Sequence, residues 1–296
     1  MNTKQNIYAK AALFFAALIW GTSFVIMKNS VDIFPPPVLL GIRFAIGTLL
    51  LSLIFNIKLR LLNKDYLIKG GIIGLMLFIA YYSQTWGLTD TTPGKNAFLT
   101  AAYCVMVPFL MWITAKKKPD AYNVVAAFLC LTGIGLVSLT EGFSISFGDS
   151  FTLLGAFFYA AHMVVIAIFS KDKDPVLLTI LQFGTSAVLA WIVALFTAEF
   201  PTNVPASAWF SLCYLGIFCT GIAMLLQNVG QKYSDASSAS IILSLEAVFG
   251  VTISILCGTE NVTLNMAIGF VLIFISVIIS ETKLSFLNKN KSSDNV

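Results

Sequence analysis

Three ionisable residues lie inside stretches that are otherwise apolar: Arg43, His162 and Glu246. A charge deep in an apolar helix is costly, so such side chains usually face a cavity, a partner or a solute. Glu246 is the only carboxylate at such a depth. It could bind a coupling proton or the cationic group of a substrate. The alternative is a structural carboxyl group that is hydrogen-bonded between helices, and both readings stay open.

The two basic candidates have more ordinary explanations. Arg43 cannot readily lose its charge, so it needs an anion, carbonyl groups or water as a partner. We favour helix pairing, or snorkelling toward the membrane surface, over contact with a substrate. His162 could sense protons. For His162 we favour a neutral imidazole that is satisfied by a neighbouring helix.

Aromatic and amide side chains form a second group of candidates. Rings give a cavity wall its contact area, and a few polar groups orient the ligand. The full set of candidate cavity residues is Trp20, Tyr82, Gln84, Asn96, Tyr103, Tyr159, His162, Gln182, Gln227 and Glu246. Trp20 is the strongest aromatic candidate. The small residues Gly21, Thr22 and Ser23 follow it, and they permit close helix approach or a flexible turn, although simple packing explains them equally well. Each amide side chain could equally form a hydrogen bond that joins two helices.

The composition requires most of the chain to lie in lipid. Hydrophobic residues make up 58% of the 296 residues and charged residues only 11%, with a mean hydropathy of +0.88. Soluble domains carry about a quarter charged residues, and a bilayer core needs roughly 20 apolar residues per helix. Charge-poor stretches of that length predict ten transmembrane helices, at residues 11–27, 34–57, 70–88, 96–115, 121–139, 151–169, 175–196, 206–228, 236–256 and 264–280.

Basic residues are distributed unevenly over the connecting segments. If the N-terminus is cytoplasmic, the inside segments hold nearly all of the 18 Lys and Arg residues, whereas the outside holds only Lys28 and Lys95. The positive-inside rule then predicts a multi-pass protein of the cell (cytoplasmic) membrane with both termini in the cytoplasm. The net charge of +4 is therefore a topology signal, and we expect no nucleic-acid partner.

The sequence lacks the residue patterns of an intramembrane enzyme or an ATP-driven pump. It has one histidine, no HExxH, GxSxG or GxxxxGK[ST] motif, and no paired carboxylates at membrane depth. The cysteines Cys104, Cys130, Cys213, Cys219 and Cys257 lie in apolar stretches without metal-ligand spacing. We interpret them as reduced packing residues, and we expect no enzyme activity, metal or cofactor.

The two halves of the chain share a weak internal repeat. The six residues that begin at Pro37 (PVLLGI) recur 138 residues later, at Pro175 (PVLLTI). Gln84 corresponds to Gln227 with a separation of 143 residues. A repeat of five helices must place its second copy upside down in the membrane. Such inverted repeats are typical of alternating-access transporters.

Four short motifs carry a family resemblance. They are ALIWGTSF at 17–24, RF at 43–44, NAFLT at 96–100 followed by Val107-Pro108, and SLE at 244–246. These motifs resemble the drug/metabolite transporter superfamily, in particular its EamA-like members, although many relatives have a proline where this chain has Ala247. The resemblance implies ten helices and a central cavity lined by helices one to four and six to nine. It places helices five and ten at the periphery.

These observations predict an all-α integral membrane protein of ten helices in two inverted five-helix repeats, at 8–139 and 149–283, followed by a polar cytoplasmic tail at 284–296. Members of the family carry amino acids, nucleotide-like metabolites, vitamins or drugs, commonly outward. We therefore expect a secondary transporter that exports a small organic metabolite, amino acid-like or related, or a drug, by alternating access. Glu246 is the candidate site for a coupling proton. The alternatives are an intramembrane enzyme and a channel or assembly subunit.

The predicted topology can be tested by cysteine labelling. In a background without the native cysteines, single cysteines beside Lys117 and beside Glu199 should react with a membrane-impermeant thiol reagent from opposite faces, because three predicted helices separate them. A cysteine beside Arg60 should share the face of Lys117 and serves as the control. Labelling of the first two positions from one face would contradict the inverted repeat.

Overall fold

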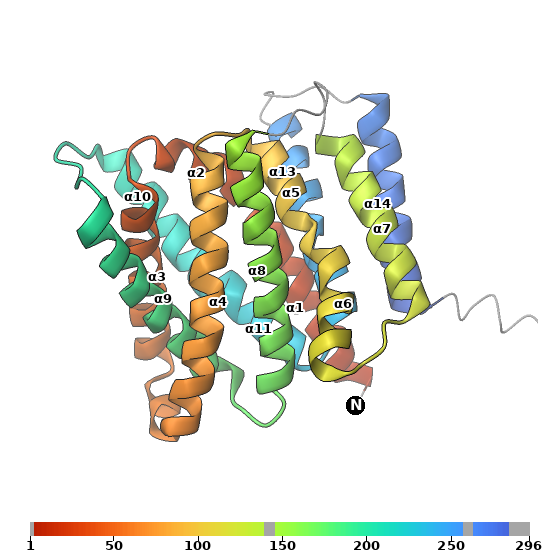
Figure 1. Ribbon diagram of the computed structural model, residues 1–296, viewed down its shortest axis with the longest axis horizontal. Coiled ribbons are helices and arrows are strands. Elements are labelled where there is room, and N and C mark those ends of the chain that lie inside the picture. Colours follow the sequence, from red (N-terminus) through yellow and green to blue (C-terminus); the bar gives the residue numbers. More distant parts are fainter. Residues whose placement is uncertain (1–2, 139–145, 257–262, 284–296) are drawn as a thin grey trace, which may run out of the picture.

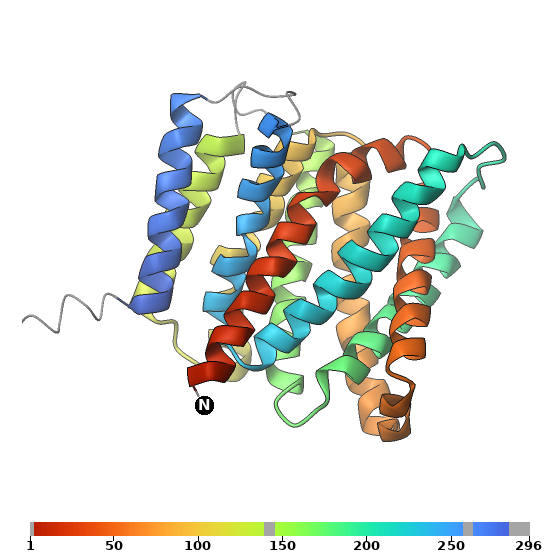
Figure 2. The ribbon, with the colours of Figure 1, turned by 180° about the vertical axis from the view of Figure 1, so that it is seen from behind.

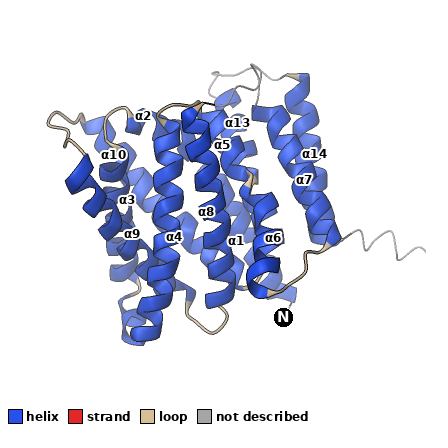
Figure 3. Cartoon of the chain, in the orientation of Figure 1, coloured by secondary structure: helices blue, strands red, loops and turns tan. Residues whose placement is uncertain are grey.

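The structure is a computed structural model that describes residues 3–138, 146–256 and 263–283. Within these ranges every regular element is a helix (Figure 3). Cys257 and the predicted polar tail at 284–296 lie outside the described residues. The all-α prediction is confirmed.

The helices follow one another with short connections. The first half contains α1 (Thr3–Gly21), α2 (Ser23–Val31), α3 (Pro36–Ile54), the 3₁₀ helix η1 (Asn56–Leu61), α4 (Lys64–Leu88), α5 (Pro93–Ala101), α6 (Tyr103–Ala115) and α7 (Ala121–Ser138). The second half contains α8 (Phe147–Phe169), α9 (Pro175–Thr197), α10 (Ala206–Tyr214), the π-helix η2 (Leu215–Ile222), α11 (Ala223–Lys232), α12 (Ala236–Leu243), α13 (Leu245–Leu256) and α14 (Leu264–Thr282).

These elements form ten membrane-spanning segments, as the sequence predicted. Eight are long and apolar enough to cross a bilayer, and the shorter apolar helices Ala121–Leu136 and Leu264–Ser280 complete the set. Several segments are not continuous α-helices. The first is interrupted at Thr22, the fourth at Ala102 and the ninth at Ser244. The eighth contains the π-helix η2 between α10 and α11.

Prolines and polar caps determine where many of the helices begin. Pro36, Pro93 and Pro175 occupy the first turns of α3, α5 and α9, where a residue without an N–H group is tolerated. Side-chain oxygens accept a hydrogen bond from a first-turn N–H at Asn63, Thr92, Ser146, Asp174, Asp235 and Thr263. These prolines and polar caps therefore mark the starts of the helices.

The two halves pack with an internal two-fold relationship. The third segment (α4) packs on the sixth (α8). Their counterparts in the other half, the eighth segment (α11) and the first (α1), pack on each other in the same way. α3 packs on its counterpart α9, and α7 on its counterpart α14. In Figures 1 and 2, α4 starts at the edge of the bundle where α1 begins, whereas its counterpart α10 starts at the opposite edge. Counterpart helices therefore run in opposite directions, and the predicted inverted repeat is confirmed.

The apolar core consists of two main clusters on either side of the bundle centre. One gathers buried side chains of α6, α7, α12 and α13, and the other those of α3, α9 and α10. Ile19, Trp20 and Tyr159 contact both clusters. α7 and α14 stand together at one side of the bundle (Figures 1 and 2), the peripheral position that the family resemblance implied for helices five and ten.

Ion pairs tie the helix ends together at the edge where α1 begins. Lys173 pairs with Asp65 at 2.5 Å, and Lys58 pairs with Asp174 at 2.6 Å. Asp174 also accepts hydrogen bonds from the N–H groups of Val176 and Leu177. Partial burial raises the pKa of Asp174, but the Lys58 ammonium and these two N–H groups outweigh it and hold the pKa below its ordinary value of 3.8. The Asp174 carboxylate is therefore both the N-cap of α9 and an ionic link to η1.

We expect Asp174→Ala to lower stability by about 1 kcal/mol, the usual cost of losing an N-cap. Asp174→Asn retains the cap and loses only an ion pair whose lysine is partly exposed, so its effect should be small. Because the folded-state pKa is depressed, the contribution of Asp174 is present above pH 3.8 and is lost as the pH falls through the folded value. Thermal unfolding in detergent from pH 7 to pH 3 measures both effects. Equal losses in the Asn and Ala variants would contradict the capping role.

Candidate functional site

A central cavity lies between the two apolar clusters. It holds about 620 Å³ of empty space, a figure that includes the part open to solvent. Its lining residues are Trp20, Ser23, Phe24, Met27, Arg43, Tyr81, Gln84, Thr85, Leu88, Asn96, Thr100, Tyr103, Tyr159, Met163, Gln227, Leu243 and Glu246. The family resemblance implied helix seven in the wall as well. Among the described residues, however, α9 contributes none.

Interrupted helices place residues at the cavity wall. Trp20 lies at the end of α1, and Glu246 lies in the first turn of α13. At these breaks, hydroxyl groups bond to nearby backbone carbonyls: Thr22 to Ile19 at 2.6 Å and Ser244 to Ile241 at 2.7 Å. Such bonds give the backbone an alternative to the helical pattern. The ninth segment is therefore interrupted at Ser244, although Ala247 stands where the family resemblance led us to expect a proline.

Glu246 and Tyr103 meet across the internal two-fold relationship. The Tyr103 hydroxyl donates a hydrogen bond to Glu246 Oε1 over 3.3 Å, and the two residues are 143 positions apart. The same separation relates Tyr81 to Met224, whose sulfur accepts from the Tyr81 hydroxyl at 3.8 Å. Residues at corresponding positions of the two halves therefore contact each other at the centre. Glu246 is only 6% exposed.

Three tyrosines form a continuous aromatic wall. The rings of Tyr81 and Tyr159 are 5.3 Å apart, and those of Tyr159 and Tyr103 are 6.4 Å apart. The Tyr159 hydroxyl donates to Gln84 Oε1 at 2.8 Å. This wall offers large apolar area together with hydroxyl groups, which suits an organic ligand.

Arg43 forms the basic part of the lining and is 2% exposed. Its Nε donates to the Thr220 hydroxyl at 3.2 Å, and its Nη1 contacts the Met27 sulfur at 2.9 Å. The guanidinium also lies over the Tyr81 ring, 5.2 Å from its centroid. Arg43 thus points into the bundle, and we correct the snorkelling alternative that its sequence position suggested.

The π-helix η2 connects to the first half through Trp20. The Trp20 indole N–H donates a hydrogen bond to the carbonyl of Cys219, a residue of η2, at 2.8 Å. Within η2, the Thr220 hydroxyl donates to the Leu215 carbonyl at 2.9 Å, five residues earlier. π-helical turns free backbone groups and are frequent at functional sites. Here the Cys219 carbonyl holds a ring of the cavity wall.

An amide network joins α4, α5 and α8 beside the cavity. Gln84 Nε2 donates to the Thr100 hydroxyl at 3.0 Å, and Asn96 Nδ2 donates to the Thr152 hydroxyl at 2.9 Å. Asn96 Oδ1 and the Thr85 hydroxyl have no partner among the described residues. Gln227 lines the cavity from α11 and donates to Gln231 at 2.9 Å. The wall therefore holds both satisfied and unsatisfied polar groups.

Three of the residues predicted for the cavity lie elsewhere. Tyr82 stacks on Phe78, with ring centroids 5.6 Å apart. His162 and Gln182 hydrogen-bond each other at 2.8 Å between α8 and α9, and both are fully buried. The contact of His162 agrees with the structural reading that we favoured. The other seven predicted residues line the cavity.

Tyr81 is the most informative residue that the sequence analysis missed. It lies one position before Tyr82 and therefore points about 100° away around the helix. Tyr81, Gln84 and Leu88 follow the spacing of one helical face, and all three line the cavity. Choosing the face that carries Gln84 would have selected Tyr81 over Tyr82.

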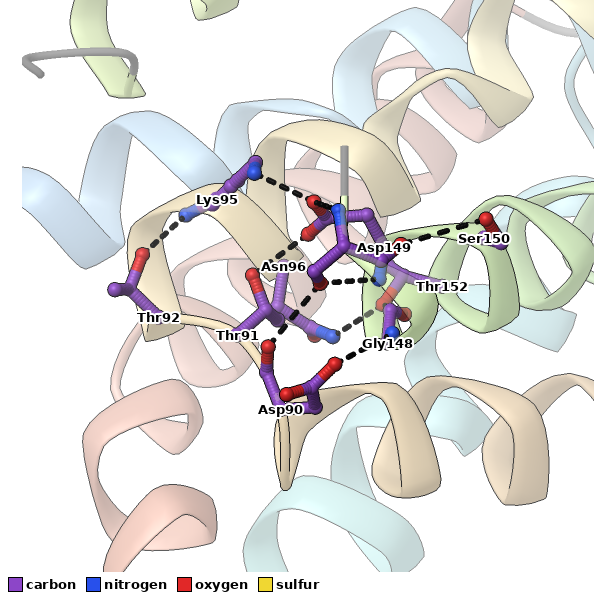
Figure 4. Close-up of polar contacts among 10 residues, drawn as sticks. Asp90, Thr91, Thr92, Lys95, Asn96, Gly148, Asp149, Ser150 and Thr152 are labelled. Atoms are coloured by element: carbon purple, nitrogen blue, oxygen red, sulfur yellow. Dashed lines mark hydrogen bonds and ion pairs between the residues drawn. The ribbon is translucent and has the colours of Figure 1, made fainter. Parts of the chain in front are cut away.

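A polar cluster closes the bundle at the edge opposite the start of α1 (Figure 4). The Asp149 carboxylate, 1% exposed, pairs with Lys95 at 2.5 Å and accepts from the Thr91 hydroxyl at 2.8 Å. The Gly148 N–H donates to Asp90 Oδ2 at 2.9 Å. These contacts tie the connection between α4 and α5 to the first turn of α8.

α4 and α8 approach almost backbone to backbone below this cluster. A Cβ atom at Gly87 would lie 2.3 Å from Thr152 Oγ1 and 2.5 Å from the Gly148 carbonyl oxygen. Glycine at this position is therefore required by the close approach of the two helices.

Comparison with known proteins gives the family. The model of the EamA-like transporter family matches residues 8–139 and 146–282. This chain belongs to the EamA-like transporter family. The two matched ranges cover both halves of this EamA-like protein, so the interrupted helices and the cavity between them lie within the family fold.

Two named relatives and one solved structure extend the comparison. An uncharacterized transporter of Archaeoglobus fulgidus is 33% identical over 93% of this EamA-like chain and 86% of its own. The uncharacterized transporter YoaV of Bacillus subtilis is 25% identical over 86% of this chain and 90% of its own. A crystal structure is similar with a TM-score of 0.78 and 18% identity, over 94% of this chain and 98% of the other, which supports the fold alone. The family and these names are those of membrane transporters and not of enzymes.

The close approach of α4 and α8 predicts opposite effects for two glycine substitutions on α4. Gly87→Ala should lower stability by about 1–3 kcal/mol, because backbone atoms of α8 must move. Gly71→Ala is the control, since nothing lies within 4 Å of the added Cβ, and it should stabilise the helix by up to about 1 kcal/mol. Thermal unfolding in detergent compares them. A Gly87→Ala protein as stable as Gly71→Ala would contradict the backbone contact.

Proposed function

We propose that this protein is a secondary transporter that moves a small organic solute across the cell membrane by alternating access. The observation that carries the proposal is the cavity itself, which lies at the meeting of two inverted halves. Its wall combines aromatic rings with a few polar groups. Such walls favour organic metabolites or drugs over bare inorganic ions, because most of the contact area is apolar.

Polar contacts at both edges of the bundle support alternating access. At one edge Lys95 of α5 pairs with Asp149 of α8. At the other edge Asp235, the N-cap of α12, pairs with Lys117. Thr92 and Asp235 occupy equivalent positions at the starts of α5 and α12. Breaking one set while the other holds would open the cavity to one side at a time.

Glu246 is the proposed site for a coupling proton. It is an ionisable group in the cavity wall, held in place by Tyr103 from the other half. Because its contact crosses between the halves, a change in its protonation would alter an interaction that the rocking motion must break. The proposed orientation has both termini in the cytoplasm, and the family resemblance favours export.

Two measurements separate this proposal from its rivals. A metabolite library screened by thermal stabilisation in detergent identifies a ligand, because a compound that binds the folded state raises its apparent stability. Flux of that ligand into proteoliposomes is then measured. Saturation and counterflow indicate a transporter, non-saturable flux indicates a channel, and chemical conversion of the ligand indicates an enzyme.

We expect Glu246→Gln to remain monodisperse and to bind the identified ligand, because glutamine can still accept the hydrogen bond from Tyr103. Its flux should lose pH dependence, since the side chain can no longer take up and release a proton. Glu199→Gln, the same change at an exposed residue, is the control and should keep the wild-type pH profile. Normal flux with an unchanged pH profile in Glu246→Gln would limit Glu246 to a structural role.

A further inference from the structure

Arg43 lies in the cavity wall without an anionic partner. The partners of its Nε and Nη1 are a hydroxyl oxygen and a thioether sulfur, and the face of the guanidinium meets the Tyr81 ring. Among the residues that the structure describes, Nη2 has no hydrogen-bond partner and no carboxylate lies within 4 Å of the guanidinium. All the groups that hold Arg43 are thus uncharged.

This arrangement leaves a buried positive charge without an ionic partner among the described residues. Arginine keeps its proton under all ordinary conditions. A buried charge is normally paired, because removing it from water costs several kcal/mol. The pairing group must therefore come from the cavity, from which Arg43 is accessible as a lining residue.

The contacts of Arg43 also fix its orientation. Thr220 donates its own proton to the Leu215 carbonyl, so its oxygen is left to accept from Arg43 Nε. Met27 holds Nη1 from α2, and Tyr81 supports the plane from α4. A guanidinium held on one edge and one face can offer its remaining N–H groups to a planar, two-oxygen anion.

We propose that Arg43 is the anion subsite of this cavity and that it binds the carboxylate group of the transported solute. The proposal rests on the proposed transport function and names its substrate class, organic carboxylates. The ring wall of Tyr81, Tyr159 and Tyr103 leads from Arg43 toward Glu246. The organic part of the solute lies along this wall, and a hydrogen-bond-donating group at its far end meets Glu246.

The test uses matched pairs of small compounds, each pair being an organic carboxylate and its primary amide. Thermal stabilisation of the full-length protein in detergent is measured for each compound, with sodium chloride titrated separately. We expect at least one carboxylate to stabilise the wild type and its amide to have no effect. Stabilisation by no carboxylate, by amides equally, or by chloride to the same degree would overturn the proposal.

Variants assign the effect to Arg43. For the active carboxylate, Arg43→Gln should raise the half-saturating concentration at least about tenfold, the equivalent of about 1.4 kcal/mol for one charge-assisted contact. Arg43→Lys keeps the positive charge but lacks the paired N–H groups of the guanidinium. Its half-saturating concentration should lie between those of the wild type and Arg43→Gln. Arg60→Gln makes the same change on an exposed residue of η1 and should behave as the wild type. Should Arg43→Gln not stay monodisperse, Arg43→Lys decides, because wild-type binding in that variant would contradict a two-oxygen contact.

The two proposals fail in different ways. Carboxylate binding that depends on Arg43, without flux of that carboxylate in proteoliposomes, would refute the transport function and leave the subsite standing. Saturable counterflow of a solute without a carboxylate, unchanged in Arg43→Gln, would support transport and refute the subsite.

Discussion

The whole structure depends on the exclusion of water from the backbone in the bilayer. Without water, each N–H and carbonyl group must find a partner inside the protein, and a helix provides one within its own segment. Irregular backbone is tolerated only where it is buried in protein or lines a cavity. The interruptions at Thr22, Ala102 and Ser244 and the π-helix η2 all lie beside the central cavity. Near these interruptions, side-chain hydroxyl groups and the Trp20 indole donate hydrogen bonds to backbone carbonyl groups.

Close approach between the halves follows from small residues rather than from apolar burial. Lipid chains are as apolar as leucine, so helices associate in a membrane through shape and hydrogen bonds. Gly87 meets α8, and its counterpart Gly230 meets Leu13 and Ala9 of α1. Gly21 lies against Phe249 of α13, near the backbone of Glu246. Close contacts at glycine therefore occur at equivalent places in both halves.

The cavity holds two ionisable side chains that a soluble core would normally pair or exclude. Arg43 and Glu246 both line it, and each is held by a neutral partner from another segment. In surroundings of low dielectric constant, electrostatic interactions are stronger than in water. Under our proposals, few polar contacts are enough to recognise a solute with complementary groups, while the tyrosine rings supply apolar contact area.

The sequence by itself determined the number of spans and the inverted repeat, because apolar length and the placement of charge can be followed along the chain without knowledge of its packing. It also placed Trp20, Tyr103, Tyr159 and Glu246 at membrane depth. It did not decide which face of each helix meets the cavity: Tyr82 and His162 lie outside it, whereas Arg43 lines it. In a chain that is apolar on nearly all faces, periodicity does not distinguish lipid from protein. Only packing against the other half fixes the rotation of each helix, and that depends on contacts between residues far apart in the sequence.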